Sequence, residues 1–351
     1  MSNFDGSDNG ETEAASALAT RPALGNLLNE LQAGEVLDGR FKILGTINRG
    51  GMASIYKAMD RMTKRAVAVK VPLSYGEGDG GFYARFQREE MIGLTLDHPS
   101  VVKFVRCEVK KSRPYIVMEY LEGRTLAALL NERPQFPEAE AARIASRVCE
   151  ALEYLHRNGV VHRDLKPENI MLCQNGSLRI MDFGIAKSAQ ARRLTFGGPS
   201  SMIGTPDYIA PEQLQGKRGD SRSDIYALGA MLYVMTTGTT PYDGDNPYVV
   251  MNARLNGDPE APRQTNPQLS PQIEEIILHA MERNPSKRYL SAMAMKAELD
   301  DYSGVNLEGR SKRLRSSRFL SAHAPLLRKI ALFAAAQAVA LLLVWWHFRH
   351  H

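Results

Sequence analysis

The chain has 351 residues, of which 44% are hydrophobic and 24% charged, as is typical of a soluble globular protein with a well-filled core. This length fits either one two-lobed domain of about 270 residues with extensions or two ordinary domains. Its three cysteines, Cys107, Cys149 and Cys173, are widely spaced without a metal-ligand or CxxC pattern, which indicates reduced thiols in a cytosolic compartment. The net charge of +5 comes from residues 310–351, which hold eight Lys or Arg and no Asp or Glu, so the remainder has 36 basic and 39 acidic residues and is not expected to bind nucleic acid.

Residues 1–35 are expected to precede the folded domain. Residues 1–21 are rich in Ser, Gly, Asn, Asp, Glu and Ala, which predicts a disordered tail, and no apolar run follows basic residues as it would in a signal peptide. A helical period of leucines then predicts a short helix at 22–33, with Leu24, Leu27, Leu28 and Leu31 on one face. Packing of this helix on the domain is favoured over docking to a partner.

Residues 36–122 have the pattern of β-strands. Five segments are rich in β-branched and aromatic residues and are separated by Gly or charged turns: Phe41–Ile47, Ser54–Met59, Arg65–Pro72, Val101–Val109 and Tyr115–Tyr120. A helical run at Gly81–Leu96 separates the third strand from the fourth. This part of the chain is therefore predicted to form a small antiparallel β lobe.

Residues 123–303 have a mainly helical pattern. The predicted helices are Thr125–Asn131, Glu138–Asn158, Ser221–Thr237, Tyr248–Leu255 and Pro271–Glu282, with a strand-turn-strand at Ile170–Met181. A strand-rich lobe followed by a larger helical lobe predicts an α+β fold with a cleft between the lobes.

The C-terminal part is predicted to attach the chain to a membrane. Residues 304–329 form a basic, solvated linker, and residues 330–346 form an apolar run whose one polar member is Gln337. As a C-terminal hydrophobic helix this run would span about 26 Å, slightly less than a bilayer core. The basic residues before it predict a single-pass anchor in the cell membrane, with the folded domain cytoplasmic and residues 347–351 as a short tail. A core helix or a self-associating surface helix is the alternative.

The most informative pattern is His162–Asn169 (HRDLKPEN), followed by Asp182-Phe183-Gly184. Asp164 can accept the proton of an attacking hydroxyl, and Asn169 and Asp182 offer the hard oxygen ligands that Mg²⁺ prefers. Lys166 can contact the transferred phosphoryl group as a fixed cation. The pattern predicts phosphoryl transfer from Mg-ATP. A polar loop that merely caps a helix would leave Asp182-Phe183-Gly184 unexplained.

Two patterns in the strand-rich part fit a nucleotide site. Gly50 and Gly51 lie between two predicted strands, where the missing Cβ lets backbone N–H groups approach phosphates. Lys70 ends an apolar strand, and the helix predicted to follow it carries Glu89 and, about 100° away, Glu90. Alone, each pattern would be interpreted as an ordinary turn or a surface charge.

In order and spacing, these motifs resemble those of the eukaryotic-like (Hanks-type) Ser/Thr protein kinases over residues 36–303, and the Gly-Gly-Met loop is most similar to the bacterial branch. The resemblance implies the bilobal protein-kinase fold, ATP as donor, and Mg²⁺ or alternatively Mn²⁺ as the metal. It implies catalytic roles for Asp164, Lys166, Lys70 and Glu89, and metal binding by Asn169 and Asp182. In this resemblance Lys70 is paired with Glu89 on the following helix, and Glu90 is the rival for that pairing. The implied nucleotide pocket comprises Ile47, Asn48, Gly50, Gly51, Ala53, Ile55, Ala68, Lys70, Met118, Glu119, Leu121 and Met171. Asn48 and Ala53 depart from the GxGxxG pattern, so ATP affinity is expected to be modestly weakened.

The segment between Asp182 and Ala210-Pro211-Glu212 is expected to be an activation loop. Its candidate phosphorylation sites are Thr195, Ser200, Ser201 and Thr205. Arg163 can pair with a phosphate installed there and order the loop; an unregulated loop is the alternative. Glu212 and Arg288 are expected to form a buried ion pair, and Asp224 to accept hydrogen bonds from the backbone of the catalytic loop.

The resemblance implies a membrane-anchored signalling enzyme that phosphorylates Ser and Thr of protein substrates and autophosphorylates on its activation loop, with a homodimer as the arrangement for reaction in trans. The alternative is a pseudokinase scaffold that binds nucleotide; the altered glycine loop supports it, and the intact Lys70, Asp164, Asn169 and Asp182 oppose it. Phosphorylation of a small molecule is disfavoured by the long loop and the Gly204–Tyr208 segment.

Overall fold

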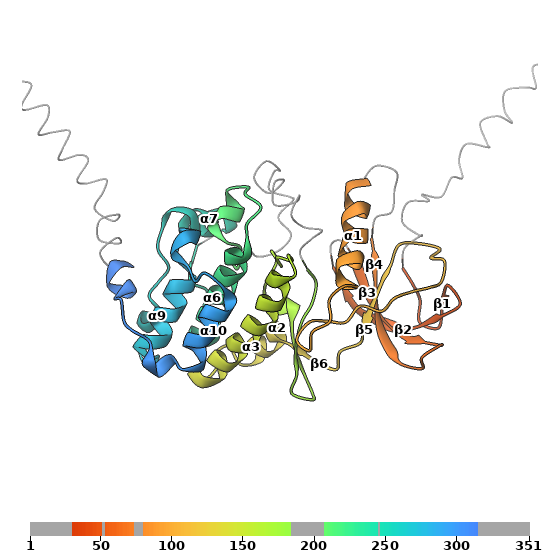
Figure 1. Cartoon of the computed structure of the whole chain (residues 1–351), viewed down its shortest axis with the longest axis horizontal. Coiled ribbons are helices and arrows are strands. Elements are labelled where there is room, and N and C mark those ends of the chain that lie inside the picture. Colours follow the sequence, from red (N-terminus) through yellow and green to blue (C-terminus); the bar gives the residue numbers. More distant parts are fainter. Residues whose placement is uncertain (1–29, 51–52, 74–79, 184–206, 245, 315–351) are drawn as a thin grey trace, which may run out of the picture. The chain divides into compact units, whose positions relative to one another are not determined.

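The computed structural model describes residues 30–50, 53–73, 80–183, 207–244 and 246–314, which divide into two compact units (Figure 1). Unit 1 contains the described residues up to Tyr83 together with Val105–Tyr120, and unit 2 contains Ala84–Phe104 and the described residues from Leu121 onward. Unit 1 is rich in strands and unit 2 in helices, as the sequence predicts.

Unit 1 is built on a five-stranded antiparallel sheet with strand order β1-β2-β3-β4-β5. The strands are β1 Val36–Leu37, β2 Phe41–Arg49, β3 Ala53–Asp60, β4 Ala66–Pro72 and β5 Ile116–Glu119. Along β3 every second residue is buried, and Tyr56 and Ala58 join Val67, Val69 and Val117 in one hydrophobic core. The side chains between these buried residues point to the opposite face of the sheet, away from this core.

The prediction of a strand at Val101–Val109 is wrong. Val101 makes one isolated parallel bridge, with Ile180, and the Val105 N–H donates to the Val117 carbonyl at 2.8 Å. The segment passes from unit 2 to unit 1 between these contacts. The two parts of the segment therefore bond to different neighbours, and its β-branched residues do not form one continuous strand.

The predicted helix at 22–33 is also wrong where it can be tested. Residues 30–33 are not helical, and residues 22–29 lie outside the described part of the chain. Leu31 is buried in the core of unit 1, and its N–H donates to the Tyr56 hydroxyl at 3.3 Å. This side-chain contact takes the place of a helical hydrogen bond.

Unit 2 is built around α6 (Ser221–Thr237), which is buried at nearly every position and is packed against α3 (Glu138–Arg157) and α9 (Pro271–Ala280) (Figure 1). Asp220 caps its first turn, and Gly238 ends it in the left-handed conformation at φ 77°. The described part of unit 2 also contains α1 (Gly80–Gly93, which begins in unit 1), α2 (Leu126–Glu132), α5 (Pro211–Leu214), α7 (Pro247–Asn256), α8 (Pro262–Thr265) and α10 (Ala292–Asp300).

A three-stranded sheet of β6 (Gly123–Thr125), β7 (Ile170–Cys173) and β8 (Leu178–Ile180) completes unit 2. The strand-turn-strand predicted at Ile170–Met181 is confirmed as β7 and β8. Helix α10, by contrast, is not anticipated from the sequence: it packs on α3 and buries three residues, Ala292, Met295 and Leu299.

The described start of the predicted linker is docked on unit 2. Arg310 is 9% exposed, and its Nη1 donates to the buried carboxylate of Glu275 at 2.7 Å. The N–H groups of Glu308 and Arg310 also donate to Glu275. A buried carboxylate requires such donors, so residues 308–310 are docked on α9 and Arg310 is not solvated as predicted.

The predicted membrane helix at 330–346 lies outside the described residues. Within the residues that the structure does describe, no helix has the length and apolar character to cross a bilayer.

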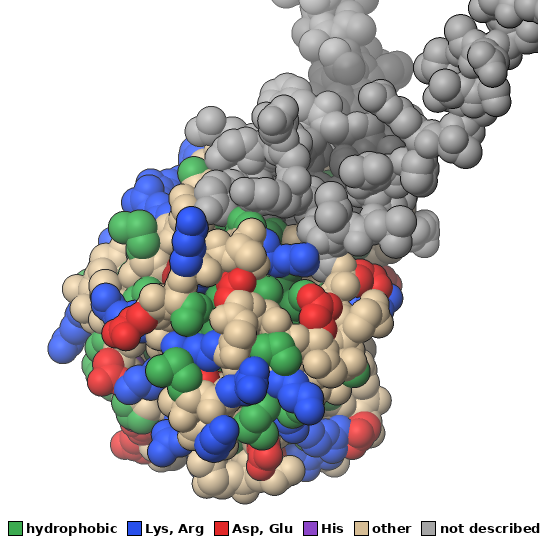
Figure 2. Space-filling model, turned by 90° about the vertical axis from the view of Figure 1, so that its right-hand side faces the viewer, with side chains coloured by type: hydrophobic (Ala, Val, Ile, Leu, Met, Phe, Trp, Pro, Cys, Tyr) green, Lys and Arg blue, Asp and Glu red, His purple; other side chains and the backbone are tan. Residues whose placement is uncertain are grey.

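Positive charge is not confined to the C-terminal segment. Residues 30–50, 53–73 and 105–120 of unit 1 contain twelve Lys or Arg and six Asp or Glu. Figure 2 shows Lys and Arg side chains over much of the lower half of one face, interspersed with hydrophobic ones. The near-neutral average of residues 1–309 therefore conceals a basic small unit.

A histidine at the end of α9 makes the stability of unit 2 sensitive to acid. Burial, together with the nearby Arg310 guanidinium, lowers the pKa of His279 from 6.5 to about 4. The unfolded chain therefore binds a proton between pH 6.5 and 4 that the folded chain does not, and stability falls as pH falls through this window. We expect the free energy of unfolding to fall by about 1–2 kcal/mol between pH 7 and pH 4.5. The partial exposure of the ring keeps this loss below the full value of the pKa shift. Urea unfolding at both pH values checks this: His279→Gln should lose less stability over that interval, and an identical loss would contradict it.

Candidate active site

The loop His162–Asn169 is held by a buried carboxylate on α6. Asp224, 1% exposed, accepts hydrogen bonds from the backbone N–H groups of His162 (2.9 Å) and Arg163 (2.8 Å). Its Oδ2 also lies 2.8 Å from His156 Nε2. The role predicted for Asp224 is confirmed: it fixes the backbone immediately before Asp164.

Two residues of the site have strained backbone conformations. Arg163 has φ 62° and Asp182 has φ 51°, in the left-handed region that non-glycine residues seldom occupy. Such a conformation persists only where the surroundings impose it, and it is concentrated at functional sites. At Arg163 the imposing contact is the hydrogen bond to Asp224.

The imidazole of His162 joins this loop to the residues around Asp182. Its Nε2 lies 3.0 Å from the Met181 carbonyl, and its Nδ1 accepts from the Asp164 N–H at 3.3 Å. A carbonyl only accepts and an N–H only donates, so the geometry requires the neutral tautomer with hydrogen on Nε2. Phe183 packs edge-on against the same ring, with centroids 5.9 Å apart.

Asp164 and Asn169 lie in contact. Asn169 Nδ2 donates to the Asp164 carbonyl at 2.8 Å and to its carboxylate at 3.3 Å. Because the amide nitrogen makes these bonds, the amide oxygen remains available as a metal ligand. The Asn169 carbonyl accepts from the N–H of Met181, the residue before Asp182. The sequence-predicted base and the two predicted metal ligands therefore lie on adjoining backbone segments.

Within the described residues there is no group of three His, Cys, Asp or Glu that could by itself hold a metal. The predicted set is one amide, Asn169, and one carboxylate, Asp182. That donor set fits Mg²⁺ bound to a nucleotide, since Mg²⁺ takes one or two protein ligands and completes its shell with phosphate oxygens and water.

Four other predicted site residues belong to unit 2. Lys166 is extended just before the 3₁₀ turn Pro167–Asn169, and Met171 pairs with Thr125 and Arg179 in the small sheet. Leu121 follows β5. Glu89 on α1 is 1% exposed, whereas Glu90 is partly exposed, so the burial favours Glu89 as the helix residue that faces inward. Lys70 belongs to unit 1, and its pairing with Glu89 stays a prediction.

In unit 1, five of the predicted nucleotide residues share one face of the sheet: Asn48, Ile55, Ala68, Lys70 and Met118. The register aligns Asn48 with Ile55, Ile55 with Lys70, and Lys70 with Ile116. In the next row Ala68 is aligned with Met118. Directly paired residues of antiparallel strands point to the same side, so these side chains lie together, opposite the hydrophobic core. Ile116 was missed from the sequence, although it stands two residues before Met118 and alternation would have placed it there.

The remaining predicted residues have diverse positions. Gly50 N–H donates to the Ala53 carbonyl at 3.0 Å and closes the β2–β3 turn. Ile47 is 48% exposed at an irregularity of β2, and Glu119 is aligned with Val67. Other predicted residues lie outside the described part of the chain: Gly51, Thr195, Ser200, Ser201 and Thr205.

The end of the predicted activation loop is anchored by a buried ion pair. Arg288 Nη1 and Nη2 each lie 2.8 Å from a carboxylate oxygen of Glu212, and Ser223 Oγ donates to the same carboxylate at 2.6 Å. Burial alone would raise the pKa of Glu212, but Arg288 and Ser223 outweigh it and hold that pKa below its ordinary value. The expected pair is confirmed.

Comparison with known proteins agrees with this geometry. Residues 41–299 match the protein kinase domain model. A probable serine/threonine-protein kinase of Streptomyces coelicolor is 38% identical over 268 residues, which are 75% of this chain and 40% of that protein. The serine/threonine-protein kinase PknB of Mycobacterium leprae is 38% identical over 267 residues, 75% of this chain and 43% of that one. The chain thus spans less than half the length of these relatives.

Solved structures have the same fold. The kinase domain of Mycobacterium tuberculosis PknI aligns with a TM-score of 0.61 at 23% identity, over 78% of this chain and all of that one. Rad53 in complex with AMP-PNP aligns with a TM-score of 0.58 at 26% identity, over 73% of this chain and 64% of that one. The strand-rich and helix-rich units are thus the small and large lobes of a bilobal kinase fold. The chain belongs to the protein kinase family, and its curated relatives are bacterial serine/threonine-protein kinases.

Proposed function

We propose that the chain is a Ser/Thr protein kinase that transfers the γ-phosphate of ATP to Ser and Thr hydroxyls of proteins. The observation that carries the proposal is the catalytic loop, in which Asp164 contacts Asn169 and is held in place through Asp224. Asp164 accepts the proton of the substrate hydroxyl, and Lys166 offers a cation to the transferred group. Asn169 and Asp182 would hold the magnesium ion, which neutralises charge on the phosphates when it is bound.

Nucleotide binding is supported by the row of Ile55, Ala68, Lys70 and Met118 on one face of the sheet. The aligned Rad53 structure contains AMP-PNP, an ATP analogue. A nucleotide-binding scaffold without activity is the weaker alternative, because it would not require the strained, hydrogen-bonded loop around Asp164.

Autophosphorylation of the segment 184–206 would regulate the site. Burial lowers the pKa of Arg163, and the positive charges of Arg218 and Arg88 lower it further. Arg163, with the positive charges of Arg218 and Arg88 that act on it, offers a receptor for a phosphate on Thr195, Ser200, Ser201 or Thr205. A homodimer would allow this reaction in trans.

Mass spectrometry of the purified protein after incubation with Mg-ATP tests the proposal. We expect added phosphate on one or more hydroxyls of residues 184–206 in the wild type and none in Asp164→Asn. Equal incorporation in both proteins, or incorporation in neither together with no phosphorylation of any Ser/Thr peptide, would contradict kinase activity.

We further propose that residues 330–346 anchor the chain in the cell membrane with the kinase domain cytoplasmic. The support is the apolar run and the basic residues before it. Deletion of residues 330–351 should move the protein from sedimented membranes to the supernatant, and Gln337→Leu should leave it in the pellet. Full-length protein that stays in the supernatant would contradict the anchor.

A further inference from the structure

A buried arginine on α7 holds the backbone that leads into Ala210-Pro211-Glu212. Arg254 is 1% exposed; its Nη2 donates to the Asp207 carbonyl at 2.6 Å and its Nη1 to the Ile209 carbonyl at 3.1 Å. Taking a guanidinium out of water is costly unless its donors find acceptors, and here two backbone carbonyls from a segment about 45 residues earlier accept from Nη1 and Nη2.

Arg254 holds one end of this segment, and Arg288 holds the other end. Arg288 lies over the ring of Tyr226 at 4.8 Å, and Arg254 lies over the ring of Tyr242 at 5.2 Å. The two hydroxyls are 3.5 Å apart. The residues 207–212 are thus fixed by two buried cations, one at the backbone of Asp207 and Ile209 and one at the carboxylate of Glu212.

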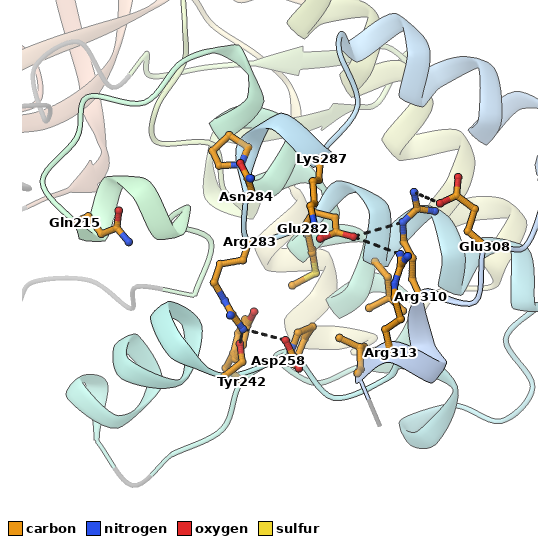
Figure 3. A pocket seen from close by; sticks show the side chains of 16 residues that line it. Gln215, Tyr242, Asp258, Glu282, Arg283, Asn284, Lys287, Glu308, Arg310 and Arg313 are labelled. Atoms are coloured by element: carbon orange, nitrogen blue, oxygen red, sulfur yellow. Dashed lines mark hydrogen bonds and ion pairs between the residues drawn. The ribbon is translucent and has the colours of Figure 1, made fainter. Parts of the chain in front are cut away.

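Tyr242 also lines a pocket of about 840 Å³, with Asp258 and Arg283 beside it (Figure 3). The ring under Arg254 is therefore not backed by close packing on every side. Stacking on the Tyr242 ring alone would constrain the Arg254 guanidinium less. Its position is therefore fixed mainly by its hydrogen bonds to the carbonyls of Asp207 and Ile209.

The held segment is in turn bonded to the catalytic loop. Gln213 Nε2 donates to the Arg163 carbonyl at 3.1 Å, and Gln213 Oε1 accepts from the Ala210 N–H at 3.2 Å. A displacement of residues 207–210 would therefore disturb the backbone of Arg163, the residue next to Asp164. The Asp207 carboxylate in this segment interacts electrostatically with Arg254 and with Glu168.

We propose that Arg254 is a positioning residue for the protein substrate. By fixing residues 207–209 it keeps the acceptor side of the site rigid, so that a peptide meets a preformed surface beside Asp164. The inference rests on the proposed kinase activity, and it concerns the peptide alone: ATP does not require this segment.

Arg254→Met tests the proposal, because it retains the apolar stem and removes both donors. With the peptide that the wild type phosphorylates best in a Ser/Thr peptide array, we expect the KM for peptide to rise about tenfold, because residues 207–209 lose both hydrogen bonds that fix them. The KM for ATP and the rate of ATP hydrolysis without peptide, where water is the acceptor, should change less than twofold. Arg254→Lys, which restores one donor, should recover part of the peptide KM.

Arg283→Met is the matched control. Arg283 lines the pocket beside Tyr242 and is paired there with Asp258. Its replacement should leave the peptide KM unchanged. An equal fall of peptide phosphorylation and ATP hydrolysis in both Arg254 variants, whether or not they unfold, would overturn the proposal. So would an unchanged peptide KM. A wild type that phosphorylates no peptide would instead refute the proposed function.

Discussion

Asp164→Asn should lower the turnover number for peptide phosphorylation about 10²- to 10⁴-fold, which is the range for loss of a positioned general base. The amide cannot take up the proton of the substrate hydroxyl. The geometry of the loop should survive, because the stronger bond from Asn169 goes to the Asp164 backbone carbonyl at 2.8 Å and the Asp224 bonds are not touched.

Steady-state kinetics with a Ser/Thr peptide, together with titration of a fluorescent ATP analogue, separate chemistry from binding. Nucleotide affinity should stay within about threefold of the wild type, since the predicted pocket of Ile55, Ala68 and Met118 is unchanged. Lys103→Gln, on an exposed lysine paired only weakly with Asp97 at 3.4 Å, serves as the control and should keep wild-type turnover. Turnover within tenfold of the wild type would exclude Asp164 as the base.

Glu212→Gln should cost about 3–5 kcal/mol in the free energy of unfolding of the large lobe. Arg288 is completely buried, and without the carboxylate its charge has no counter-charge at a place that water does not reach. The carbonyls of Glu282 and Arg222 would still accept from it, which limits the loss but does not neutralise it. Arg288→Met should cost a similar amount, because it leaves the carboxylate of Glu212 buried with only neutral donors, the Ser223 hydroxyl and the Glu212 N–H.

Urea denaturation monitored by circular dichroism measures both variants. Because the two residues form one interaction, the double variant Glu212→Gln/Arg288→Met should lose clearly less than the sum of the single losses. Arg157→Gln removes an arginine that is 74% exposed from an ion pair with Glu153 and should cost less than about 1 kcal/mol. Additive losses at Glu212 and Arg288 would show that the pair is not coupled.

The chemistry of the site could be predicted because it is encoded over short distances. Asp164 and Asn169 stand five residues apart on one loop, and their contact follows from local backbone geometry. The limits of α6 were predicted correctly, since a continuous apolar sequence is closed by an Asp cap and a Gly terminator. Asp224 and the Glu212–Arg288 pair were also anticipated, through the resemblance to kinases and not through any local signal.

Other features could not be predicted, because their cause lies in a distant part of the chain. The strand-like composition of Val101–Val109 gives no sign that Val101 is paired with Ile180 and Val105 with Val117. Arg310 has the sequence context of a solvated linker, yet the buried carboxylate of Glu275 draws it onto α9. Periodicity describes which side of an element is apolar, but it does not identify the partner that covers that side.

The amino-acid sequence by itself determined the kinase motifs, the order of strands and helices, and the residues able to handle a proton and a metal-bound phosphate. Only the tertiary structure decided that Arg254 donates to the Asp207 and Ile209 carbonyls, that Lys70 is aligned with Ile116, and that residues 308–310 are docked. The physical reason is that propensity and capping act over a few residues, whereas the burial of a charge is settled by whichever donors and acceptors the whole fold brings within reach.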